Sequence, residues 1–207
     1  MDSSLEIAAL LQDSAAMGDT LASELRPQDG SSLRVHDVAI DYFRQSATRI
    51  TAQYTLELEA EDGRRASQIF TVVHFADGRM ERQWRRIQAG APDTQMPVGF
   101  FQLPGARFST TLQSIVQAFP FDARLPGLRR IVAGAAEVRR LVSPTRADEI
   151  VSWQVDVVRY RPDMRAMARV DVKFGKNGDA DTLRVYAKAY RDCDEGQRAY
   201  GLLEALA

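Results

Sequence analysis

Apolar and polar residues alternate with a period of two in six separate stretches of the chain. The stretches are rich in Val, Ile, Thr and Tyr, and they are residues 34–43, 49–59, 67–75, 153–161, 165–174 and 182–190. Such alternation places apolar side chains on one face of a strand and polar side chains on the other, as in an antiparallel sheet. We therefore predict two antiparallel β-meanders of three strands each, one in each half of the chain.

Helices are expected at the start of the chain and between the strands. Ser3 and Glu6 have the spacing of a capping box, and the apolar residues that follow indicate one amphipathic helix ending before Pro27. Further helices are expected at residues 78–88, at 129–142 and from about Asp194 onward. The predicted class is therefore α+β, with helices flanking the two meanders, while residues 90–118 receive no assigned role.

The two meanders resemble each other in sequence. Arg49 aligns with Arg165 and Ala52 with Ala168, at a separation of 116 (165 − 49). The hairpin loops slip by one residue, after which the separation is expected to return to 116 and to pair Val72 with Lys188. We therefore predict an internal repeat in which only the second copy carries a buried strand lysine. A one-residue slip would turn Val72 and Lys188 to opposite faces of the sheet.

Turn-forming residues divide the chain. Residues 119–128 form a proline-containing connector, and Ser143, Pro144 and Thr145 mark a boundary. We predict a cap-like α+β domain over residues 1–142 and a second domain over residues 143–207.

Charge and hydropathy exclude several classes of partner. The formal net charge of the 207 residues is −1, so no whole-chain field favours nucleic acid or an anionic membrane. Arg79, Arg82, Arg85 and Arg86 are interpreted as a solvated helix face. No apolar run approaches the ~20 residues that a membrane-spanning helix needs, and no secretory leader is evident. These features predict a cytoplasmic protein without a nucleic-acid or membrane partner.

Few residues of the chain offer catalytic or metal-binding chemistry. Cys193 is the only cysteine, which excludes an internal disulfide and a thiolate zinc cluster. His36 and His74 are the only histidines, and His74 is interpreted as a packed strand residue rather than a base. We therefore predict no metal site and no catalytic residue.

Lys188 is the candidate functional residue. The chain has three lysines, of which Lys173 and Lys176 precede a hairpin turn, whereas Lys188 lies within an apolar strand. One interpretation is that its ammonium group reaches the sheet edge and is solvated there. The other is that it binds a phosphate and is held by a carboxylate of the following helix. Glu195 and Glu204 are nine residues apart, on opposite sides of that helix, so at most one faces the sheet.

The second meander resembles a known family. The segments Arg159–Ala166, Val185–Asp192 and Glu195–Tyr200 are similar to the N-terminal lobe of aminoglycoside-phosphotransferase-like kinases, including maltokinase-like proteins. The connector at residues 121–128 looks like the segment that precedes this lobe in related bacterial proteins. The resemblance covers residues 119–207 and implies a kinase-like N-lobe with an ATP site.

In that family the strand lysine contacts ATP phosphates and pairs with a helix glutamate, while the first hairpin covers the nucleotide. The resemblance therefore implies Lys188 as the phosphate ligand and Glu204 as its partner. It implies a nucleotide cover at the turn formed by Pro162, Asp163, Met164 and Arg165. Asp163 departs from the family, which often has glycine there, and would bring a negative charge toward the phosphates.

A second departure is that no catalytic loop with an aspartate base and a metal-binding asparagine follows Lys188. Phosphoryl transfer needs positioned Mg²⁺ and an oriented nucleophile. We therefore expect a cap plus nucleotide-binding portion of a small-molecule phosphotransferase. It would have a weak or incomplete ATP site, would be inactive alone, and would use Mg²⁺ only with a catalytic C-terminal lobe or partner protein. The alternative is a non-catalytic binding or interaction module that retains the shape of the N-lobe.

Overall fold

The protein is α+β and divides into two compact units, residues 1–121 and residues 122–207. The computed structural model describes residues 3–24, 33–90, 95–98, 101–133, 147–176, 179–192, 194, 196 and 197. The predicted domain boundary between residues 142 and 143 lies outside the described residues. The connector at residues 122–128 belongs to the C-terminal unit.

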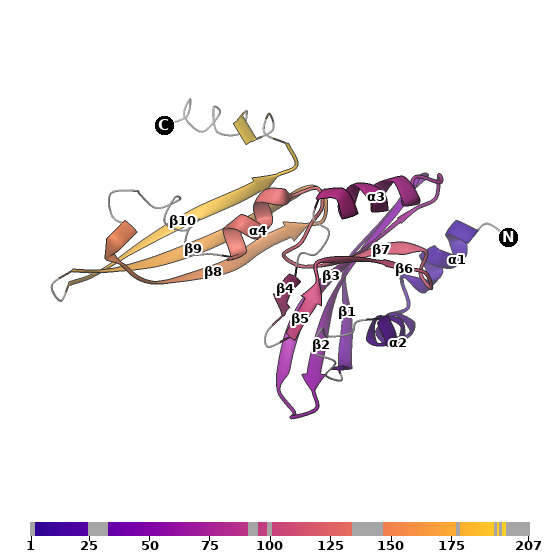
Figure 1. Ribbon diagram of the computed structural model, residues 1–207, viewed down its shortest axis with the longest axis horizontal. Coiled ribbons are helices and arrows are strands. Elements are labelled where there is room, and N and C mark those ends of the chain that lie inside the picture. Colours follow the sequence, from indigo (N-terminus) through magenta and orange to yellow (C-terminus); the bar gives the residue numbers. More distant parts are fainter. Residues whose placement is uncertain are drawn as a thin grey trace. The chain divides into compact units, whose positions relative to one another are not determined.

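The N-terminal unit is built on a sheet of five antiparallel strands (Figure 1). The first three strands form the predicted meander, and two short strands from residues 106–118 extend it beside the third. In spatial order the strands are β1 (Leu33–Ser46), β2 (Arg49–Ala60), β3 (Arg65–Phe75), β7 (Ser114–Ala118) and β6 (Ala106–Ser109). The predicted strands of this half are therefore confirmed, whereas β6 and β7 were not anticipated.

Two helices cover one face of this sheet, where a single helix was predicted. The helices are α1 (Ser3–Leu10) and α2 (Ser14–Glu24). The break is stabilised by Asp13, whose carboxylate accepts the Ala16 amide hydrogen at 3.0 Å, as an N-cap residue does. Leu11, between the helices, is fully buried, and its carbonyl accepts a 2.6 Å hydrogen bond from the Tyr54 hydroxyl. The break therefore follows from packing and capping, which the helical period does not reveal.

The remaining elements of this unit are α3 (Met80–Gly90) and a two-stranded hairpin. The hairpin pairs β4 (Gln95–Val98) with β5 (Phe101–Pro104) in the stretch that lacked clear periodicity. The predicted helix at residues 78–88 is confirmed. Its Trp84 ring lies 6.3 Å from that of Phe108 on β6, measured between centroids.

The C-terminal unit is a three-stranded antiparallel sheet with a helix against one face (Figure 1). Its elements are α4 (Pro126–Ala133), the 3₁₀ turn η1 (Ala147–Glu149), β8 (Ile150–Arg161), β9 (Arg165–Lys176) and β10 (Asp179–Tyr190). Alternate residues of β9 are buried on the face that α4 contacts, as are Leu125, Leu128 and Ile131; the β9 residues are Ala166, Ala168, Val170, Val172 and Phe174. The predicted meander is confirmed, and the predicted final helix falls almost entirely outside the described residues.

The two meanders share strand order and antiparallel pairing, but the predicted register of the third strand is wrong. Ala52 pairs with Val72, whereas its counterpart Ala168 pairs with Ala187 rather than with Lys188. The reason is loop length. In the first meander the bond from the Ala60 amide to the Arg64 carbonyl leaves three residues in the turn, 61–63. In the second, the pair Lys176–Asp179 leaves two, 177 and 178. Ala187 therefore occupies the buried position equivalent to Val72, and Lys188 faces the other way.

Candidate functional site

The face of the C-terminal sheet that points away from α4 carries most of its charged residues. Cross-strand partners share a face, so the pairing of the strands defines which side chains lie on it. We call this face the polar face; its residues include Gln154, Asp156, Arg159, Arg161, Arg165, Met167, Arg169, Asp171, Arg184, Tyr186, Lys188 and Tyr190.

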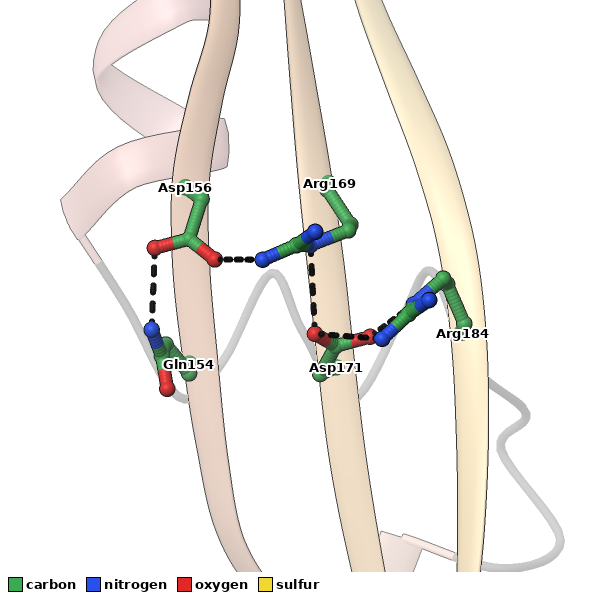
Figure 2. Close-up of polar contacts among 5 residues, drawn as sticks. All are labelled: Gln154, Asp156, Arg169, Asp171 and Arg184. Atoms are coloured by element: carbon green, nitrogen blue, oxygen red, sulfur yellow. Dashed lines mark hydrogen bonds and ion pairs between the residues drawn. The ribbon is translucent and has the colours of Figure 1, made fainter.

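Five of these residues form a chain of polar contacts across all three strands (Figure 2). Arg169 on β9 lies between two carboxylates, 2.5 Å from Asp156 Oδ2 on β8 and 3.2 Å from Asp171 Oδ2. Arg184 on β10 donates to Asp171 through its Nε atom at 2.6 Å, and Gln154 donates to Asp156 at 2.9 Å. The two carboxylates of this network are therefore committed to arginines of the neighbouring strands.

The same contacts favour the ionised forms of both carboxyl groups. The hydrogen bond from Arg184 lowers the pKa of Asp171, and the charges of Arg184 and Arg169 lower it further. The hydrogen bond from Gln154, followed by that from Arg169, lowers the pKa of Asp156. Because both side chains remain partly exposed to solvent, the network is screened by salt and contributes little to folding stability.

The end of the polar face next to the β8–β9 turn is different, because it is cationic. Arg159 and Lys188 pair with Met167 from its two sides, and in the row nearer the turn Arg161 and Tyr190 flank Arg165. Neither of these two rows contains a carboxylate. We call Arg159, Arg161, Arg165 and Lys188 the cationic end; of these, all but Arg161 are exposed and Arg161 is half-buried.

The expectation that Lys188 is a buried cation is wrong, since the side chain is exposed. The register places the small residues Ala187 and Ala189 on the buried face, where they are 7% and 4% exposed, and turns Lys188 outward. Its expected partner Glu204, and the alternative candidate Glu195, both lie outside the described residues.

The predicted nucleotide cover at residues 162–165 is a tight turn held from within the unit. Pro162 and Asp163 are buried, whereas Met164 and Arg165 are exposed. Asp163 has a φ of 60°, in the left-handed region that favours glycine and tolerates aspartate. Since Asp163 is only 8% exposed, its side chain does not project from the turn toward solvent, contrary to the expectation that it would oppose an incoming phosphate.

Asp122 organises this turn and was not identified from the sequence as a site residue. Its Oδ2 atom accepts hydrogen bonds from the Asp163 amide at 2.8 Å and from the Tyr160 hydroxyl at 3.0 Å. Its Oδ1 atom accepts the Arg124 amide hydrogen at 2.8 Å. The last contact has the Asx-turn spacing and could have been predicted locally. The hydrogen bonds from Tyr160 of β8 and from the Asp163 amide in the turn could not have been predicted locally.

The other candidate residues have structural roles. His74 is 6% exposed, and its Nδ1 atom lies 2.9 Å from the Gln113 carbonyl, so the prediction of a packed strand residue is confirmed. Within the described part of the chain, no group of three or more His, Cys, Asp or Glu side chains is placed to hold a metal ion. No helix in that part combines the length and apolarity needed to cross a bilayer.

Comparison with known proteins identifies no family. No family model and no curated protein matches the chain. One solved structure, described as "Ntf2 like protein involved in plasmid conjugation", aligns over 80% of this chain and 75% of its own at 9% identity. Its TM-score is 0.21, which is too low to support an argument about fold or function.

Proposed function

We propose that the C-terminal unit is the nucleotide-binding portion of a small-molecule phosphotransferase of the aminoglycoside-phosphotransferase-like class. In this proposal Lys188 binds ATP phosphates, the turn at residues 162–165 covers the nucleotide, and the N-terminal unit is a cap. A catalytic lobe supplied elsewhere would contribute Mg²⁺ ligands, the base and acceptor specificity. Such an enzyme would work in the cytoplasm, where ATP is abundant.

The observation that carries the proposal is the position of Lys188 relative to the turn. Lys188 pairs with Met167, two positions along β9 from Arg165, which closes the turn. The lysine and the exposed turn residues Met164 and Arg165 therefore lie at the same end of one sheet. An anion bound there would meet the Lys188 ammonium and the Arg159 guanidinium, which can both donate charge-assisted hydrogen bonds to phosphate oxygens.

Two further features fit a nucleotide. The carboxylates of the polar face, Asp156 and Asp171, are engaged by arginines and lie toward the other end, so repulsion of a phosphate at the cationic end is reduced. Tyr186 is 58% exposed and is two residues from Lys188 on the same strand face. Its ring offers a surface on which a base can stack.

The test is a titration of the ¹⁵N-labelled protein with MgATP, followed by two-dimensional NMR. We expect shifts at Lys188, Arg159 and residues 163–165, with a dissociation constant weaker than micromolar because half of a cleft buries little of a ligand. Lys188→Ala should weaken binding at least about fivefold, the loss of one charge-assisted hydrogen bond. Lys173→Ala is the matched control, an exposed lysine of the same unit near the opposite end of the polar face.

Equal effects of the two lysine substitutions, or shifts confined to other residues, would contradict the nucleotide site. The proposal also implies that this chain alone transfers no phosphate. Steady ATP turnover by the pure protein that disappears in Lys188→Ala would show instead that the chain is a complete enzyme.

A second candidate, a non-catalytic interaction module, is favoured by one observation. Trp153 and Leu183 flank Val172 on the apolar face of the same sheet, yet they are 42% and 36% exposed. Exposed apolar residues that adjoin one another are typical of protein interfaces. This candidate predicts no nucleotide-dependent shift at the cationic end, so the same titration separates the two functions.

A further inference from the structure

The polar face of the C-terminal sheet carries a positive charge that the composition of the whole chain conceals. Among the residues that the structure describes, this face holds seven lysines and arginines and two carboxylates, a net charge of +5 (7 − 2), whereas the formal net charge of the chain is −1. The basic residues are Arg159, Arg161, Arg165, Arg169, Lys173, Arg184 and Lys188. The expectation of no nucleic-acid partner rested on the charge of the whole chain, which does not describe this face.

Strand pairing arranges these charges in five rows across the sheet. The two rows nearest the β8–β9 turn are the cationic end, and the fifth row, at the other end, has Lys173 as its one charged residue. In the two middle rows each carboxylate is matched by an arginine, Asp156 by Arg169 and Asp171 by Arg184 (Figure 2). No row therefore has a net negative charge. At about 3.4 Å per residue, the five rows extend roughly 27 Å along the strands.

The polar face is open to solvent and presents an aromatic ring. No residue of the five rows is buried, because α4 packs against the opposite face of the sheet. Tyr186 in the third row is 58% exposed, and Tyr190 in the first row is half-buried. Met167, which is half-buried, is the one aliphatic apolar side chain of these rows. The face therefore lacks the group of exposed apolar side chains with which a protein enters a membrane surface.

An extended polyanion with accessible flat groups complements these features. Proteins that bind single-stranded nucleic acid combine cationic side chains along the phosphate backbone with aromatic rings on which bases stack. A duplex keeps its bases stacked inside, where a ring on a flat sheet cannot reach them. We propose that the polar face binds single-stranded nucleic acid, with phosphates along the cationic end and at Lys173 and a base stacked on Tyr186. This inference goes beyond the proposed nucleotide site, because the row of Lys173 lies outside that site.

The test measures binding of fluorescein-labelled oligomers to the full chain by fluorescence anisotropy. The oligomers are oligo(dT), oligo(U) and an abasic deoxyribose-phosphate chain, each about 12 units long, because sites of this kind cover about 4–16 nucleotides. We expect oligo(dT) or oligo(U) to bind at least about fivefold more tightly than the abasic oligomer, since only they offer a base to Tyr186. The tighter of the two identifies the preferred sugar. The logarithm of affinity should fall with the logarithm of salt concentration with a slope of roughly −2 to −3.5, which corresponds to about three to five phosphate contacts.

Three variants test the residues of the polar face. Tyr186→Ala should weaken binding of the better base-bearing oligomer about fivefold or more and leave that of the abasic oligomer within about twofold. Lys173→Ala should weaken binding of both about fourfold and make the salt slope less negative by about 0.7. Arg82→Gln is the matched control, because it removes one exposed positive charge from α3 of the other unit, and it should change neither affinity by more than about twofold. Circular dichroism checks that each variant is folded.

Three results would each overturn the proposal: equal affinity for the abasic and base-bearing oligomers, equal effects of Lys173→Ala and Arg82→Gln, or binding to phosphatidylserine vesicles without binding to any oligomer. The comparison of oligomers uses the unaltered protein, so a misfolded variant would not prevent a decision. The nucleotide site is tested separately by the MgATP titration. Binding of oligo(dT) or oligo(U) without binding of MgATP would refute the nucleotide site alone, and the reverse result would refute nucleic-acid binding alone.

Discussion

The carboxylate of Asp122 accepts the backbone amide hydrogen of Asp163 at 2.8 Å, across 41 residues of chain. Asp122 is 2% exposed and belongs to the connector that precedes α4, whereas Asp163 is in the turn between β8 and β9. This single bond ties the connector to the turn that the proposed function uses as a nucleotide cover. The connector is therefore part of the C-terminal fold and not merely a link between two domains.

Replacing Asp122 should strongly destabilise the C-terminal unit. Asp122→Ala removes the acceptor of two buried or half-buried backbone amides and of the Tyr160 hydroxyl. We expect a loss of about 3 kcal/mol or more in the free energy of unfolding, because buried donors lose a charged acceptor. Urea unfolding followed by Trp153 fluorescence, with Trp84→Phe introduced so that Trp153 is the only tryptophan, measures this unit. Asp148→Ala, at an exposed position, is the control and should change the stability by less than about 0.5 kcal/mol.

The register of β10 predicts opposite outcomes at neighbouring positions. Ala187→Lys would place an ammonium group on the buried face and should cost about 2–4 kcal/mol through desolvation and overpacking. Lys188→Ala, on the exposed face, should change stability by less than about 0.5 kcal/mol. Guanidinium unfolding curves of the two variants, compared with the parent protein, make the test. A larger loss from Lys188→Ala than from Ala187→Lys would mean that β10 is shifted by one residue.

The polar network predicts a titration that depends on Arg184. Arg184→Gln should raise the pKa of Asp171 toward the ordinary value near 4, because its hydrogen bond is the largest cause of the lowered pKa. Since the folded-state pKa is depressed, the stabilisation is present above the unfolded-state pKa and is lost as the pH falls through the folded-state pKa. Carboxyl ¹³C shifts followed against pH give the folded-state pKa of Asp171 in the parent protein and in the Arg184→Gln variant. Arg165→Gln, outside the network, should leave Asp171 unchanged, and added salt should reduce the difference.

Tyr54 predicts a loss of stability in alkali. Burial raises the pKa of its hydroxyl above the ordinary value near 10, and the neutral group donates to the Leu11 carbonyl. The raised folded-state pKa means that its contribution is complete below pH ~10 and is lost as the pH rises toward the folded-state value. Tyr54→Phe should lower the neutral-pH stability by about 1–2 kcal/mol and make the alkaline loss less steep. Tyr42→Phe, at a half-buried position, is the control. The measurement is the free energy of unfolding from pH 8 to pH 11. An equal slope against pH in Tyr54→Phe and in the parent protein would contradict this role.

Local residue patterns were sufficient to predict much of the secondary structure. Alternation of apolar and polar residues marked all six strands of the two meanders, because side chains on a strand point alternately to two faces. The charged composition of residues 78–88 indicated α3. Burial of His74 followed from its place in such a strand. These features depend on neighbouring residues, so the sequence by itself determined them.

Other features depended on contacts between residues that are distant in the chain. Pairing of β7 with β3 joins Ile115 to Val73, and no periodic signal specifies that partner. The difference of one residue between two hairpin loops turned Lys188 to the exposed face and Ala187 to the buried one. The three hydrogen bonds of Asp122, and the approach of Trp84 to Phe108, likewise arise only when packed elements meet. Side-chain alternation is a property of each strand alone, whereas register, long-range hydrogen bonds and ring contacts are properties of pairs of elements, which only the tertiary structure decided.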